Sequence, residues 1–237
     1  MYYLESMDLF VLGHAGSGKS SFVKAFSEYL EGYEVKCINL DPATPPIYKV
    51  DIDIRNYIKT EDVMKKYRLG INSALIKSIE LSIPFIKNFR LQGDYILYDT
   101  PGQMELFLSS IYGRETVDIL KTDTTASIFL MDLTTIQDAE SFLSTIMENV
   151  IVTLRLYIPS LTVFTKSDIA SIDIDRLKKE IMEKSGVLPE LLEKTIEFIE
   201  YTNIPQRTLM ISNINKNGFD ELLSALNELF CSCGDIS

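Results

Sequence analysis

Short apolar runs alternate along the chain with longer segments in which apolar residues recur every three or four positions. The short runs are typical of buried strands, and the longer segments are typical of amphipathic helices. The strands are predicted at residues 7–12, 34–39, 95–99, 126–131, 160–165 and 207–211. The helices are predicted at 18–31, 137–157, 173–185, 189–202 and 217–230, with a break between two of them at 185–189. This alternation predicts an α/β fold with a mostly parallel central sheet flanked by helices.

The stretch 42–92 between the second and third predicted strands is long for a connection in a compact domain. It has helical periodicity of its own at 60–67 and 73–89, and Pro84 is expected to kink or interrupt the second helix. An insertion of this size usually carries function or forms a subunit interface. We therefore expect one domain over residues 1–237 that contains a helical insertion.

Composition narrows the classes of protein to consider. Hydrophobic residues make up 46% of the 237 positions, enough for one sizeable core, and 34 acidic against 23 basic residues give a net charge of -11. Broad nucleic-acid binding needs clustered Lys and Arg, so direct binding of nucleic acid is not expected. Cys37, Cys231 and Cys233 are too few for a disulfide framework, and the tail pair lacks the four ligands of a structural metal site. With no signal peptide and no apolar run as long as a membrane span, we expect a cytoplasmic protein without membrane contact.

A glycine-rich loop lies between the first predicted strand and the first predicted helix. It reads Gly13-His14-Ala15-Gly16-Ser17-Gly18-Lys19-Ser20, with Ser21 after it. The pattern G-x-x-x-x-G-K-[ST] in this setting is typical of the P-loop NTPase fold, in which loop N–H groups and the helix N-terminus face a nucleotide's phosphates. We expect Lys19 to contact the β- and γ-phosphates and the Ser20 hydroxyl to bind Mg²⁺. His14, the only histidine, is expected to point its side chain outward, because the variable positions of this loop mostly present backbone.

The third predicted strand ends in a second motif, Asp99-Thr100-Pro101-Gly102-Gln103. A carboxylate at this position can hold Mg²⁺ through a bound water, so Asp99 is a candidate metal ligand. Gly102 permits close backbone approach to a γ-phosphate, so the turn can sense whether that phosphate is present. Gln103 and Glu105 stand where an attacking water would need orienting. The alternative is an ordinary turn sequence.

Asp41 follows the second predicted strand, within Asn39-Leu40-Asp41-Pro42-Ala43. It should therefore project from the sheet edge that carries the phosphate loop and Asp99. A second carboxylate there can contact the metal's water shell or orient a nucleophilic water. The alternative is an aspartate that merely begins a turn before proline.

Two loops after the later strands are candidates for the base pocket. Thr165 ends the fifth predicted strand, and Lys166 and Asp168 follow it. The carboxylate of Asp168 can accept hydrogen bonds from N1–H and N2–H₂ of guanine, a pair that adenine lacks. The alkyl stem of Lys166 can lie over the base. Ser212, Asn213 and Ile214 follow the last predicted strand and are expected to complete the pocket with a backbone N–H, although such a loop is also ordinary there.

In this order, the motifs resemble the GPN-loop GTPase family, and most of all its archaeal, single-protein branch. The stretches that carry the resemblance are the phosphate loop, Asn39 to Ala43, Asp51 to Arg55, Leu69 to Leu75, Asp99 to Glu105 and Thr165 to Asp168. Together they cover nearly the whole chain. One departure is plain: the family's Gly-Pro-Asn stands here as Gly70-Ile71-Asn72, with Ser73 where glycine is usual. Isoleucine frees φ and restores an N–H, so the loop should be less rigid than in the family.

The resemblance implies a homodimer formed through the insertion, in which Asn72 reaches the partner's nucleotide near the γ-phosphate. A neutral amide suits this role, because it can donate to phosphate oxygens or hold a water without adding charge. The alternative is that Asn72 only caps a helix beginning at Ser73 or Ala74. The family also implies a role in assembling other protein complexes, with a client that the sequence does not identify.

We therefore expect a Mg²⁺-dependent GTPase that hydrolyses GTP to GDP and phosphate and acts as a homodimeric switch. Asp41, Gln103 and Asn72 would position water, since phosphoryl transfer depends mainly on placement and electrostatics. Two alternatives stay open at this point. One is a kinase on the same fold, and the other is a nucleotide-binding assembly scaffold with little turnover.

Overall fold

The strands of the computed structural model form a single parallel sheet. The structure describes residues 6–173 and 209–231, together with 176, 177, 179, 183, 186, 187, 189–191 and 194 between them. The strands are β1 (Met7–Gly13), β2 (Val35–Asn39), β3 (Ile52–Asp53), β4 (Tyr95–Asp99), β5 (Thr125–Asp132), β6 (Ser160–Thr165) and β7 (Leu209–Met210). Their order in the sheet is β3-β2-β4-β1-β5-β6-β7, so β1 lies at the centre. Every pair is parallel, which puts all the carboxyl ends at one edge.

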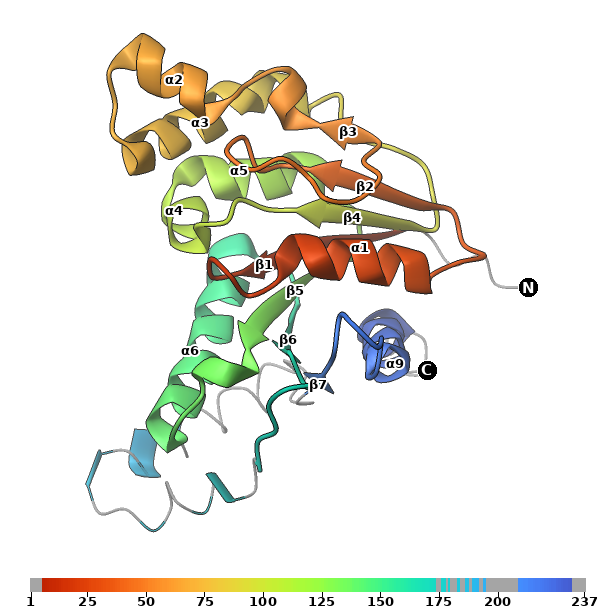
Figure 1. Ribbon diagram of the computed structural model, residues 1–237, viewed down its shortest axis with the longest axis vertical. Coiled ribbons are helices and arrows are strands. Elements are labelled where there is room, and N and C mark those ends of the chain that lie inside the picture. Colours follow the sequence, from red (N-terminus) through yellow and green to blue (C-terminus); the bar gives the residue numbers. More distant parts are fainter. Residues whose placement is uncertain are drawn as a thin grey trace, which may run out of the picture.

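Helices cover both faces of this sheet. They are α1 (Lys19–Tyr29), α2 (Thr60–Tyr67), α3 (Ile71–Ile86), α4 (Met104–Ser109), α5 (Ile111–Leu120), α6 (Ala139–Leu156) and α9 (Phe219–Cys231), with short 3-10 turns at Ile54–Asn56 and Leu133–Thr135. Figure 1 shows α2 and α3 together at the end of the molecule where β3 lies.

Alternating residues of the strands divide the core into two clusters. On β1, Leu9 and Val11 pack with buried residues of α1 and α9, whereas Phe10 and Leu12 pack with residues of α3, α4, α5 and α6. This period of two is what a sheet buried on both faces requires. Burying apolar area at about 25 cal/mol per Å² makes these clusters the main source of the fold's stability.

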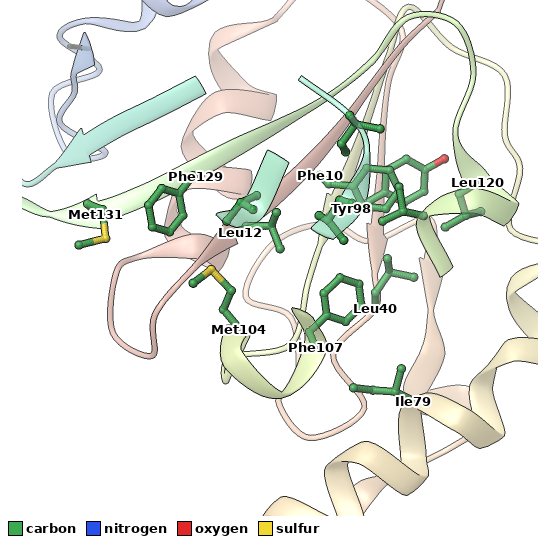
Figure 2. Packing of buried hydrophobic residues seen from close by; sticks show 14 of the residues in the cluster. Phe10, Leu12, Leu40, Ile79, Tyr98, Met104, Phe107, Leu120, Phe129 and Met131 are labelled. Atoms are coloured by element: carbon green, nitrogen blue, oxygen red, sulfur yellow. The ribbon is translucent and has the colours of Figure 1, made fainter. Parts of the chain in front are cut away.

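The cluster that contains Phe10 and Leu12 holds the segment after β4 against the sheet. Figure 2 shows Met104 and Phe107 of α4 facing Leu12 and Leu40, and both α4 side chains are almost fully buried. Phe10 and Tyr98 stack beside them with ring centroids 4.5 Å apart. Core packing therefore holds the first turn of α4 next to the carboxyl edge of the sheet.

Most predicted elements are present, and the differences have local causes. The strands β1, β2, β4, β5 and β6 and the helices α1, α2, α6 and α9 lie where the periodicity predicted them. Only part of the predicted strand 207–211 is described, and the helices predicted at 173–185 and 189–202, with the break between them, fall largely outside the described residues. No sequence pattern predicted the two-residue strand β3 or the short helices α4 and α5.

The insertion differs from expectation at Pro84. The helix α3 begins at Ile71 and continues past Pro84 to Ile86, so the expected interruption is wrong. Proline gives up one i→i−4 hydrogen bond there, and burial of neighbouring α3 side chains such as Ile83 and Ile86 in the core offsets that cost. Among the described residues, no single helix is long and apolar enough to cross a bilayer; α2 and α3 meet that test only together, across a bend of 108°.

Candidate functional site

Loops at the carboxyl edge of the sheet bring the predicted site residues together. The phosphate loop follows β1, Asp41 follows β2, Asp99 ends β4, and Lys166 follows β6. In Figure 1 the loop between β1 and α1 lies beside α4 and α6. The crevice beyond the carboxyl ends of the strands is where open α/β sheets bind ligands.

Glycine is required at defined points of the phosphate loop. Gly16 and Gly18 have φ of 82° and 91°, in the left-handed region. At Gly13 a Cβ atom would lie 2.4 Å from the carbonyl oxygen of Leu130, so any side chain there would collide with β5. Ala15, Gly16 and Ser21 are exposed, whereas Ser17 is buried and its hydroxyl has no hydrogen-bond partner within the described part of the chain.

Lys19 is buried and lies against backbone carbonyls of the site. Its Nζ donates to the carbonyl oxygens of Gly13 at 2.7 Å, His14 at 2.9 Å and Gly102 at 3.3 Å. Burial lowers the pKa of this ammonium from its ordinary value. The amine thus links the phosphate loop to the turn after β4 and has neutral acceptors that an anionic ligand would readily replace.

Ser20 and Asp99 meet at the position expected for a cation. The Ser20 hydroxyl donates to Oδ2 of Asp99 at 2.7 Å, and the Tyr48 hydroxyl donates to the same oxygen at 3.0 Å. Burial raises the pKa of Asp99 to about 6, although these hydrogen bonds oppose the shift. Tyr48 was missed by sequence reasoning, because a tyrosine in an irregular stretch of the insertion gives no local signal.

Asp41 joins the loop after β2 to the turn after β4. Its Oδ2 accepts from the Gly102 N–H at 3.1 Å, and its Oδ1 accepts from the Ala43 N–H at 2.8 Å. Asp41 therefore does begin a turn, but it also contacts the Gly102 turn 61 residues further along the chain. Next to Gly102, Oε1 of Gln103 is buried and has no hydrogen-bond partner among the residues that the structure describes.

The side chain of His14 is 36% exposed and pairs with two carboxylates, a pairing that the sequence did not predict. Its Nδ1 lies 2.5 Å from Oε1 of Glu105 and its Nε2 lies 2.8 Å from Oε2 of Glu148. These carboxylates lie on α4 and α6, so the imidazole joins the phosphate loop to both helices. Glu148 gave no signal in the sequence because it is an ordinary polar position of an amphipathic helix.

The candidate base pocket is built from the loops after β6 and β7. The Ser212 hydroxyl donates to Oδ1 of Asp168 at 2.7 Å, and Asn213 Nδ2 donates to the Gly18 carbonyl at 3.3 Å. Thr165 is buried and its hydroxyl donates to the Ser17 carbonyl at 3.0 Å, so this loop is tied directly to the phosphate loop.

Lys166 adopts a left-handed backbone conformation at the end of β6. Its φ is 65°, and its Nζ pairs with the carboxylate of Asp132 at the end of β5. Asp132 was not singled out from the sequence. Ile214 is 83% exposed, and its N–H donates to the Ser212 hydroxyl at 3.2 Å, so in this structure that N–H serves the loop itself.

Asn72 lies in the first turn of α3 and is exposed. The helix begins at Ile71, with Gly70 as its N-cap residue, so the interpretation of Asn72 as a cap for a helix starting at Ser73 or Ala74 is wrong. Ile71 occupies the first helical position, where proline is favoured because its missing N–H would be unpaired anyway. The backbone of Ile71 therefore lies in a helical conformation that proline could also adopt at this position.

Comparison with known proteins relates this geometry to named relatives. Residues 11–232 match a family described as "Conserved hypothetical ATP binding protein". GPN-loop GTPase PAB0955 of Pyrococcus abyssi is 26% identical over 95% of this chain and 98% of that protein. GPN-loop GTPase 3 of Danio rerio is 33% identical over 72% of this chain and 63% of its own length. The crystal structure of the Pyrococcus abyssi GTPase PAB0955 in its apo form aligns with a TM-score of 0.82, covering 96% of this chain and 98% of that one.

Proposed function

This chain belongs to the GPN-loop GTPase family, and from that premise we propose that it hydrolyses GTP to GDP and phosphate as a Mg²⁺-dependent homodimer. The observation that carries the proposal is one continuous set of contacts along the sheet edge. Lys19 and Ser20 of the phosphate loop contact Gly102 and Asp99 of the turn after β4, and Thr165 ties the base-side loop to Ser17. These contacts support a phosphate site, a metal site and a base site that form one unit.

Phosphate binding would use the loop N–H groups and Lys19. To reach the β- and γ-phosphates, Nζ must leave its present acceptors, and one of these is the carbonyl of Gly102. Binding of the nucleotide would therefore release one of the contacts that hold the turn after β4. This exchange gives a physical route by which that turn can respond to the phosphates.

The metal site would consist of the Ser20 hydroxyl and, through water, Asp99. Mg²⁺ there would neutralise charge on the β- and γ-phosphates. The residues present fit the ion, because a hydroxyl and a buried carboxylate are hard oxygen donors that already lie 2.7 Å apart. The described residues contain no group of three or more His, Cys, Asp or Glu side chains arranged for a metal, and Mg²⁺ shared with phosphates does not need one.

Water positioning is assigned to Gln103 and Asp41. Oε1 of Gln103 is buried without a partner among the described residues, and a buried acceptor of this kind is an unused site for an attacking water. Asp41 accepts a hydrogen bond from the N–H of Gly102, the residue before Gln103. His14 engages Oε1 of Glu105, so only Oε2 of that carboxylate would be open to a water.

Base selection is assigned to Asp168 and Lys166. Ser212 donates to Oδ1 of Asp168, and because each carboxylate oxygen has two lone pairs, both oxygens can still accept from guanine. The matching family description mentions ATP, whereas the named relatives are GTPases, and a carboxylate acceptor favours guanine. The family also suggests that the GTP and GDP states help to assemble other protein complexes, with a client yet to be identified.

Single-turnover hydrolysis tests the proposal. We expect phosphate release from GTP but not from ATP, a loss of release when EDTA removes Mg²⁺, and a rate per subunit that rises with protein concentration as dimers form. Transfer of labelled γ-phosphate to an acceptor other than water would instead support the kinase. With GTP in excess over protein, release of no more than one phosphate per subunit would support the scaffold.

The role of Asn72 in trans gives a separate prediction. Asn72→Ala should slow GTP hydrolysis about tenfold while changing GTP affinity less than about twofold, because a γ-phosphate contact from the partner would act mainly in the transition state. Ser73→Ala is the matched control, since Ser73 is exposed in the same helical turn. Equal hydrolysis rates for both variants and the wild type, measured where the protein is dimeric, would remove Asn72 from the site.

A further inference from the structure

The imidazole of His14 connects three separate elements of the protein. It lies on the phosphate loop, contacts Glu105 in the first turn of α4, and contacts Glu148 near the middle of α6. The distances are 2.5 and 2.8 Å, and the ring also meets Phe129 edge-on, with centroids 6.4 Å apart. Figure 1 shows the loop, α4 and α6 side by side at this edge of the sheet.

Both contacts call for the doubly protonated ring. Carboxylates only accept hydrogen bonds, so each imidazole nitrogen must carry a proton if both bonds are to form. The hydrogen bond to Glu148, followed by that to Glu105, raises the pKa of His14 to about 9, although partial burial opposes the shift. The charged groups that face this bridge are Glu105 from α4, Glu148 from α6 and Lys19, whose charge acts on Glu105.

We propose that His14 is a positioning residue for hydrolysis, whose bridge to Glu105 and Glu148 holds the first turn of α4, and with it Gln103, against the phosphate loop. This inference rests on the proposed GTPase function. Glu105 is two residues from Gln103, and Met104 between them is buried in the core, so a displacement of Glu105 would be passed on to Gln103.

The bridge gains importance when nucleotide is bound. In the present structure the turn before α4 is held through the Gly102 carbonyl by Lys19 and through the Gly102 N–H by Asp41. The first of these contacts is lost when Lys19 turns to the phosphates. The His14 side chain does not have to leave its partners to bind phosphate, so its bridge still ties α4 to the loop in the substrate complex.

Titration of the single histidine tests whether the bridge exists, independently of catalysis. Because the chain has only one histidine, its imidazole proton signals in an NMR spectrum belong to His14. We expect a pKa of about 9 in the wild type and a shift toward the ordinary value of about 6.5 in Glu148→Gln and Glu105→Gln. Glu115→Gln, which changes an exposed carboxylate of α5, is the matched control. An ordinary pKa in the wild type would overturn the proposal.

The bridge also predicts the sign of a pH effect on stability. The pKa of His14 in the folded protein lies above that of an unfolded histidine, so the stability from the bridge is fully present below about pH 6.5 and is lost as the pH rises through about 9. In His14→Gln, Tm should lack the fall that the wild type shows as the pH rises through about 9. An identical dependence of Tm on pH in variant and wild type would contradict the bridge.

Kinetics test the positioning role itself. His14→Gln and Glu148→Gln should each lower kcat for GTP about tenfold with KM changed less than about twofold, and the double variant should be no slower than the slower single one. The wild-type kcat should fall above about pH 9, and His14→Gln should lose that fall.

The outcomes separate the two proposals. A wild-type protein that does not hydrolyse GTP would overturn the proposed function. A wild type that hydrolyses GTP, together with a His14→Gln variant of unchanged kcat, would overturn only the positioning role of His14.

Discussion

Lys19→Met is expected to abolish GTP hydrolysis and to weaken GTP binding about 1,000-fold. The variant keeps the length of the side chain but removes its charge, and with it two charge-assisted hydrogen bonds to phosphate. At about 2 kcal/mol each, those bonds correspond to roughly three powers of ten in affinity. The effect should be large because the ammonium is buried beside the phosphate loop and poorly screened by solvent.

Lys24→Met is the matched control for this variant. Lys24 lies on the same helix, α1, but is exposed, so its removal should leave GTP binding within about twofold of the wild type. Isothermal titration calorimetry gives the affinities, and thermal melting of both variants checks their folding. Wild-type affinity in a folded Lys19→Met protein would show that phosphates bind elsewhere.

Asp168→Asn is expected to weaken GTP binding about 100-fold and to allow xanthosine triphosphate to bind. The carboxylate can accept two hydrogen bonds from guanine, and hydrogen bonds to a charged group contribute about 1.5 to 3 kcal/mol each. Asparagine keeps one acceptor and adds a donor, which matches the carbonyl that xanthine carries in place of guanine's amino group. Ser212 already holds the side chain through Oδ1, so the substituted group should keep its orientation.

The control for base selection is an aspartate at the opposite edge of the sheet. Asp123 is exposed and lies in the loop that leads into β5, so Asp123→Asn should bind GTP as the wild type does. Competition between GTP, ATP and xanthosine triphosphate for one labelled nucleotide measures the change in specificity. Unchanged preference for GTP in Asp168→Asn would remove Asp168 from the base pocket.

The sequence alone determined which residues gather at one edge of the sheet. A phosphate loop after the first strand and aspartates after later strands predict a common site, because a parallel sheet brings the carboxyl ends of its strands together. The observed contacts of Ser20 with Asp99, of Asp41 with Gly102 and of Thr165 with Ser17 follow this rule. Local sequence carried this information because glycine and proline constrain the backbone around them directly, and apolar runs mark where each strand ends.

Only the tertiary structure decided which side chains meet across elements. The contacts of Tyr48 with Asp99, of Lys166 with Asp132 and of His14 with Glu148 join residues that no spacing rule relates. Such pairs depend on how helices and loops pack on the sheet, and that packing is set by side chains throughout the core. Sequence spacing determines position along an element, but contact between elements is decided by the three-dimensional packing that buries their apolar faces.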